Sequence, residues 1–98
     1  MMEIRKTDTF ARWLDRLKDP KARAKVLVRI SRLAIGNPGD VKPVGKGVSE
    51  MRIPYGPGYR VYFVQQGNHL IILLAGGSKR TQSKDIQNAI NLMENLEK

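Results

Sequence analysis

The residues with the clearest capacity for chemistry lie in the stretch EMRIPYGPGYRVYF, residues 50–63, where two arginines stand beside three tyrosines around a Gly-Pro-Gly turn. Because side chains alternate along a strand, Arg60 is expected to share a face with Tyr62. By the same rule Arg52 shares a face with Glu50 on the preceding strand, while the more apolar alternate positions meet the core. Both arginines and Tyr62 are therefore predicted to point together into an open concavity, with Glu50 nearby.

A second basic segment, GGSKRTQ at residues 76–82, follows the last predicted strand. Its glycines are expected to let the backbone turn sharply, and the meander topology then brings Lys79 or Arg80 toward Arg60. Guanidinium groups match phosphate oxygens and aromatic rings accept unstacked bases, so the pattern predicts a site for single-stranded RNA. The predicted cluster comprises Arg52, Arg60, Lys79 and Arg80, with Lys42 and Lys46 farther out and Tyr55, Tyr59 and Tyr62 as stacking residues. The competing interpretation is a solvated sheet face whose tyrosines only stabilise the hairpin.

The composition restricts the classes of function that the chain can have. Its 98 residues suffice for one domain with one core. The absence of cysteine excludes disulfides and thiolate metal sites, a single histidine argues against a histidine-based metal site, and no cofactor is expected. The longest apolar run, residues 70–75, is too short to span a bilayer, and the charged first ten residues do not resemble a signal peptide, so a soluble cytoplasmic protein is predicted. The net charge of +9 indicates a polyanionic partner, the alternative being that it serves only solubility.

Hydrophobic periodicity predicts two helices joined tightly as a hairpin. The first is expected over residues 9–18, with Asp8 or Thr9 as its cap. The second opens with Asp19 as N-cap and Pro20 at the first helical position, where the missing N–H of proline costs nothing. The hairpin should therefore pack its apolar faces on something flat.

That flat surface is the predicted sheet. Strands are expected at residues 2–7, 46–53, 58–65 and 69–75, followed by a final helix over residues 81–98 with Ser83 as a plausible cap. The strand at 69–75 is apolar on both faces, which suits a central, covered position. The predicted class is α+β: an N-terminal strand and a helical hairpin on a mainly antiparallel sheet of three or four strands, plus a C-terminal helix. All helices are expected on one sheet face, which leaves the other partly open.

From Phe10 to Asn88 the chain resembles the RelE/ParE toxin superfamily, and specifically its phage-derived, HigB-like branch of Gp49-like addiction module killer proteins. The blocks GDVKPVG, GPGYRVYF and LLAGGSK carry this resemblance, in the order and spacing usual for that branch. It covers nearly the whole chain, so residues 1–98 are expected to form a single RelE-like toxin domain.

The resemblance implies the toxin of a type II toxin–antitoxin pair, an endoribonuclease that cuts messenger RNA without metal, often on the ribosome. The implied partner is a cognate antitoxin, expected to be a small helix-turn-helix protein from an adjacent gene. Arg60 matches the phosphate-contacting arginine of the family, Arg52 a basic position on the preceding strand, and Lys79, or less closely Arg80, the basic residue after the glycines. The chain departs from RelE at Glu50, where RelE has a further basic residue, and its last helix lacks the catalytic tyrosine of RelE.

The mechanism that follows uses the ribose 2′-hydroxyl as nucleophile, with Arg60 and Arg52 holding the charge that develops on the phosphate. Lys79 is the first candidate for acid or base, because a lysine crowded by other cations gives up its proton more readily. Glu50 and His69 are further candidates. Two alternatives remain open, a ParE-like gyrase inhibitor without ribonuclease activity and a non-catalytic basic RNA-binding module.

Overall fold

The computed structural model of the protein describes residues 1–96, so the last two residues of the predicted final helix lie outside the described part of the chain. The elements follow the expected order of a strand, a helical hairpin, a meander of strands and a final helix. They are β1 (Glu3–Lys6), α1 (Asp8–Arg16), α2 (Pro20–Ala34), β2 (Val41–Gly45), β3 (Val48–Ile53), β4 (Tyr59–Gln66), β5 (Leu70–Ser78), the 3-10 turn η1 (Lys79–Thr81) and α3 (Gln82–Leu96).

The sheet has five strands in the order β1-β5-β4-β3-β2, with β1 parallel to β5 and the other pairs antiparallel. The α+β class and the mainly antiparallel sheet are therefore confirmed, although three or four strands were expected. The additional strand is β2, which lies at the sheet edge. Pro43 is tolerated there because the outward side of an edge strand needs no hydrogen-bonded neighbour.

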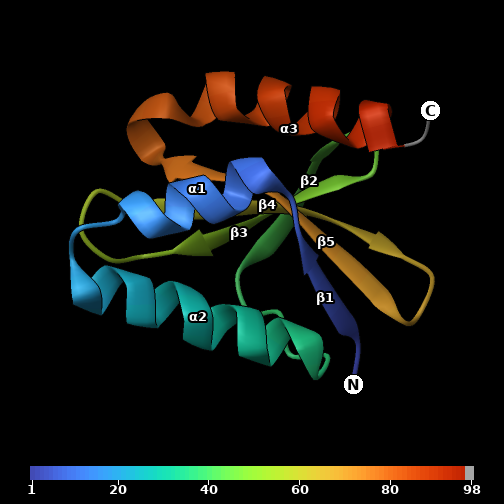
Figure 1. Cartoon of the computed structure of the whole chain (residues 1–98), viewed down its shortest axis with the longest axis horizontal. Helices are drawn as coiled ribbons and strands as arrows, with labels where there is room; N and C mark the ends of the chain where they lie inside the picture. The colour runs from blue at the N-terminus through green and yellow to red at the C-terminus, as the bar shows by residue number, and fades with distance from the viewer. Residues whose placement is uncertain (97–98) are drawn as a thin grey trace.

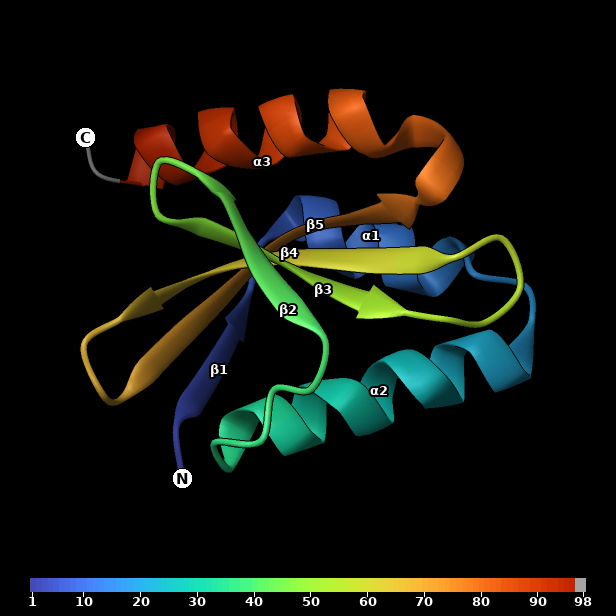
Figure 2. The same ribbon diagram turned by 180° about the vertical axis from the view of Figure 1, so that it is seen from behind.

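The helices cover both faces of the sheet, as the two views in Figures 1 and 2 show. One face packs on α1 and α2 around a core that includes Phe10 and Phe63, whereas the other packs on α3 around Leu74 and Met93. The expectation that all helices lie on one face is therefore wrong. The apolar character of β5 on both faces is the physical reason, because each face requires a cover.

Helix caps follow the predicted chemistry at α2 but not at the other helices. Asp19 caps α2 through a hydrogen bond from the Lys21 backbone N–H, at 2.9 Å, as expected. The cap of α1 is Thr7 and not Asp8 or Thr9, because the Thr7 hydroxyl is also held by β5. The helix α3 begins directly after η1, which places the expected cap Ser83 inside the helix. Within residues 1–96, none of the helices is both long and apolar enough to cross a membrane.

The two glycines after the apolar run do not form a turn, because Gly76 and Gly77 lie within β5. Each instead allows close approach of a side chain from the helix on its own face. A methyl group at Gly76 would overlap the Trp13 indole of α1, and one at Gly77 would overlap the Asp85 carboxylate of α3. Glycine is required at these positions for space and not for backbone conformation.

Candidate functional site

A surface depression of about 220 Å³ lies at the end of the β3–β4 hairpin, next to the start of η1. The residues that line it are Asp40, Arg52, Ile53, Pro54, Gly58, Tyr59, Arg60 and Lys79. Three cationic side chains from three separate segments thus meet there, with Asp40 as the one acidic lining residue. Strand alternation and the meander predicted that Arg52, Arg60 and Lys79 meet, and all three line this depression. The predicted concavity was open, however, whereas Arg60 is buried, with 8% of its surface exposed.

Sheet register explains why these cations meet. Arg52 of β3 lies directly opposite Arg60 of β4, and paired residues in an antiparallel sheet share a face. The backbone N–H of Lys79 donates to the Gly58 carbonyl at 2.9 Å, which brings the start of η1 beside the start of β4. The Arg60 Nη1 atom donates to the same carbonyl at 3.0 Å, so one backbone oxygen positions both cations.

Glu50 lies beneath this cluster and has no exposed surface. Its carboxylate accepts hydrogen bonds from Arg52 Nε at 3.1 Å, from the Tyr62 hydroxyl at 3.2 Å and from Gln82 Nε2 at 2.8 Å. The Arg60 Nε atom is 3.6 Å from the same carboxylate and forms an ion pair with it. One buried anion therefore anchors two arginines from neighbouring strands and attaches them to α3.

The environment keeps this carboxylate ionised. Burial acts to raise the pKa of Glu50, but the hydrogen bonds from Gln82, Arg52 and Tyr62, together with the charge of Arg60, outweigh it and lower the pKa. Burial also raises the pKa of Tyr62, and the adjacent Glu50 charge raises it further, so Tyr62 stays a hydrogen-bond donor. Glu50 does not line the depression, which places it as a support and not as a surface group.

The predicted tyrosines divide between the two faces of the sheet. Tyr62 is fully buried under α3 and has no surface on which a base could stack. Tyr55 lies on the opposite face, and its hydroxyl donates to Asp19 at 2.9 Å. Tyr59 is partly exposed, lines the depression and meets Trp13 edge to face, with the ring centroids 6.2 Å apart. Of the three, Tyr59 alone combines exposure with proximity to the cations.

The remaining predicted residues do not line the depression. Arg80 is exposed on η1 next to Lys79, and Lys42 is exposed on the edge strand opposite Glu50. Lys46 lies in the β2–β3 turn, at the opposite end of β3 from Arg52. His69 is exposed in the β4–β5 turn, at the far end of β4 from Arg60.

Three contributors to the site were not identified from the sequence. Gln82 donates to the buried carboxylate, Asp40 lines the depression, and Trp13 packs against Tyr59. The two-sided apolar pattern of β5 is the signal that would have placed α3, and with it Gln82, over this face. Across residues 1–96, no three His, Cys, Asp or Glu side chains gather in the way that a metal site would require.

Comparison with known proteins identifies the family. The family model described as phage-derived protein Gp49-like (DUF891) matches residues 12–96. An uncharacterized protein from Haemophilus influenzae is 50% identical over 95 residues, which cover 97% of this chain and 96% of that protein. A chain of the toxin–antitoxin complex RelBE2 from Mycobacterium tuberculosis has the same fold, with a TM-score of 0.58 and 23% identity, over 80% of this chain and 98% of that chain. The expected RelE-like fold is thereby confirmed, and the protein belongs to the family of phage-derived Gp49-like proteins.

Proposed function

We propose that this protein is the toxin of a type II toxin–antitoxin pair and that it acts as a metal-independent endoribonuclease on messenger RNA, in association with the ribosome. The observation that carries the proposal is the meeting of Arg52, Arg60 and Lys79 at one depression, in a chain of net charge +9. Membership of the Gp49-like family and the fold shared with a chain of a toxin–antitoxin complex support it.

The reaction requires few parts. The ribose 2′-oxygen attacks the adjacent phosphorus while the bond from phosphorus to the 5′-oxygen breaks, which leaves a 2′,3′-cyclic phosphate and a 5′-hydroxyl. The 2′-hydroxyl loses one proton and the departing 5′-oxygen gains one. Arg60 and Arg52 stabilise the charge on the phosphorane oxygens, a contribution of about 3 kcal/mol for each donor of this kind. Lys79 is the exposed cation at the depression that can exchange a proton, since arginine remains protonated.

Glu50 serves this reaction as a positioning residue. It holds one nitrogen of the Arg52 guanidinium at 3.1 Å and pairs with Arg60 Nε at 3.6 Å, so both groups are oriented before a phosphate arrives. Preorganised donors need no rearrangement when charge develops, which is why such donors stabilise a transition state more than a ground state. We therefore replace the expected acid or base role of Glu50 with an anchoring role.

Arg60→Ala tests the proposal. Arg60 is buried and pairs with the buried Glu50, so this variant should lose some stability, yet it should still fold because Glu50 retains its three other donors. Cleavage of ribosome-bound messenger RNA by the folded variant should fall by about 100-fold or more. The control is Arg5→Ala, which removes an exposed arginine from the edge strand β1. This variant should cleave normally. The measurement is a map of new 5′ ends after induction, together with circular dichroism of each variant.

The nucleophile is tested separately with a message that carries 2′-deoxyribose at the cut site. The proposed reaction requires that this message remain intact, and normal cutting of it would disprove the internal attack. Growth arrest without any new 5′ ends would instead favour the gyrase-inhibiting alternative.

We further propose that the antitoxin docks on α2. A groove of about 320 Å³ runs between this helix and the end of β3, and its lining residues are Ala24, Lys25, Val28, Arg29, Arg32, Ile53, Pro54 and Tyr55. Val28 is 48% exposed at an apolar floor with cations on its rim, a combination complementary to an acidic amphipathic segment. Arg29 links this groove to the proposed active site, because its Nη1 atom donates to the Arg52 carbonyl at 2.6 Å.

A further inference from the structure

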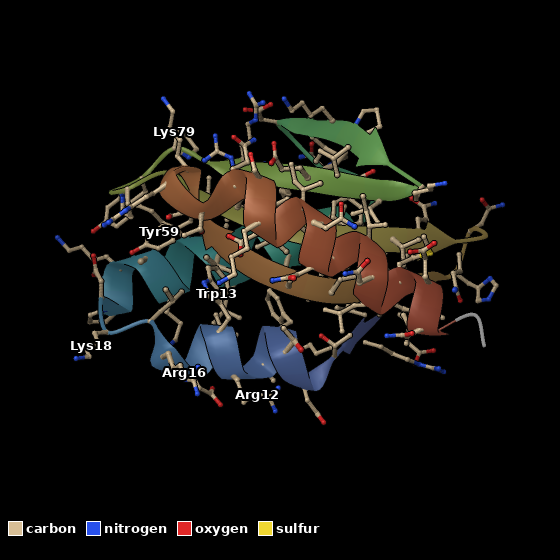
Figure 3. The ribbon with its side chains drawn as sticks, turned by 90° about the horizontal axis from the view of Figure 1, so that it is seen from above. Arg12, Trp13, Arg16, Lys18, Tyr59 and Lys79 are labelled. Carbon is tan, nitrogen blue, oxygen red and sulfur yellow. The ribbon has the colours of Figure 1, made fainter. Side chains whose placement is uncertain are left out.

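The surface of α1 next to the depression carries a second group of cations that the proposed reaction does not use. Arg12 and Arg16 lie one helical turn apart, and Lys18 follows the end of the helix. All three are exposed, and within residues 1–96 none of them forms an ion pair or a side-chain hydrogen bond. Figure 3 shows these side chains on one side of Trp13 and Tyr59, with Lys79 on the other side.

The rings of Trp13 and Tyr59 lie against each other and together form an aromatic shelf. Their centroids are 6.2 Å apart in an edge-to-face arrangement, and both side chains are partly exposed. The indole lies close over Gly76, where a methyl group would overlap it, so the β5 backbone fixes the position of the ring. Because Tyr59 also lines the depression, the aromatic shelf is continuous with the site that contains Arg60.

We propose that the aromatic shelf, together with Arg12, Arg16 and Lys18, binds the single-stranded RNA that flanks the phosphate held at Arg60. This inference rests on the proposed function and names the path of the substrate. A single strand presents phosphates along its backbone and bases with exposed π faces, and a surface of cations beside aromatic rings matches both. Stacking tolerates any base, so the shelf supplies affinity without fixing the cleavage sequence.

A protein partner fits this surface less well. An acidic segment would satisfy the α1 cations, but it would leave the two aromatic rings between the cations without a matching feature. The apolar floor that a helical partner requires is present on α2 instead, at the groove that contains Val28. The continuity of the shelf with the depression therefore favours a ligand that has to reach both.

The sequence supplies its own probe, because Trp13 is the only tryptophan. The experiment titrates the full chain with a single strand of about ten 2′-O-methyl ribonucleotides, which cannot be cleaved through the 2′-oxygen. Stacking on the shelf should quench the Trp13 fluorescence, and the binding constant should fall steeply as salt is added. An RNA duplex of the same length should quench much less, because its bases are already stacked.

The test variant is Arg12→Gln/Arg16→Gln. Loss of two phosphate contacts on a single strand should reduce the slope of log binding constant against log salt by about 1.4. The control is Arg5→Gln, which removes an exposed cation of β1 and should leave the slope unchanged. Circular dichroism confirms that both variants fold.

The outcomes separate this inference from the proposed function. Cleavage that depends on Arg60, with no quenching by RNA and no effect of Arg12→Gln/Arg16→Gln, would overturn the shelf and leave the ribonuclease. Quenching by RNA without any cleavage on the ribosome would support the aromatic shelf and overturn the proposed ribonuclease activity. Quenching by a synthetic acidic amphipathic peptide but not by RNA would assign the α1 surface to a protein partner and overturn the inference.

Discussion

Replacement of Glu50 by glutamine is the perturbation that probes the buried anchor most directly. The side chain keeps its shape but loses its charge, in a position with no exposed surface. Three hydrogen bonds end on this carboxylate, from Arg52, Tyr62 and Gln82. The amide of glutamine has one acceptor atom where the carboxylate has two, so at least one of these donors must lose its partner.

The expected loss in the free energy of unfolding is about 2 kcal/mol. A hydrogen bond to a charged acceptor contributes about 1 kcal/mol more than one to a neutral acceptor, and the buried Tyr62 and partly buried Gln82 bonds lose this difference in full. Tyr62 and Gln82 share Oε2 and can share the amide oxygen, so Arg52, which donates to Oε1, is the donor that loses its partner. Its loss costs little, because 35% of that side chain is exposed and water can replace the acceptor. A neutral amide costs less to bury than a carboxylate, and this difference offsets part of the loss at Arg52.

Urea denaturation followed by Trp13 fluorescence measures the loss, and pH identifies its origin. Because the folded pKa of Glu50 lies below its ordinary value of 4.5, its ionised form stabilises the fold above that pH. This stabilisation is lost as the pH falls through the folded pKa. The difference in stability between wild type and Glu50→Gln should therefore be largest near neutral pH and should shrink as the pH falls below 4.5 and through the folded pKa.

The control is Glu94→Gln, which removes an exposed carboxylate of α3 and should change stability by less than about 0.5 kcal/mol. Equal stability of wild type and Glu50→Gln at neutral pH would refute the anchor. A difference between the two that does not vary with pH would show that the lost contribution is packing and not charge.

Three further predictions concern the supports of the site and its partner. Gly76→Ala should destabilise the fold by about 1–3 kcal/mol in urea denaturation, because the added methyl overlaps the Trp13 indole, and a simultaneous change of Trp13 to leucine should recover part of the loss. Thr7→Ala removes the acceptor for the Phe10 backbone N–H, at 3.1 Å, and should lower stability by about 1 kcal/mol. Val28→Glu places a negative charge in the α2 groove and should weaken antitoxin binding at least tenfold by calorimetry, with messenger cleavage unchanged.

Much of the local structure follows from the sequence alone. The Asp19-Pro20 pair starts α2, and the alternation within β3 and β4 places Arg52 and Arg60 on one face. These features depend on backbone dihedrals and on the period of two along a strand, which neighbouring residues determine. The approach of Lys79 depended in addition on the pairing of β4 with β5, which the order of the strands in a meander predicted.

The burial of the site was decided only by the tertiary structure. A helical stripe shows which side of α3 is apolar, but it does not show which sheet face that side covers. Once α3 packs over β4, Tyr62 is buried and cannot stack on a base, and Glu50 becomes an anchor held by Gln82 from a distant part of the chain. The meeting of Trp13 with Tyr59 is equally non-local, since it requires α1 to lie against a glycine of β5. Residue types and their periodicity thus determine which charges share a face, whereas the packing of helices from both ends of the chain determines which of them reach solvent.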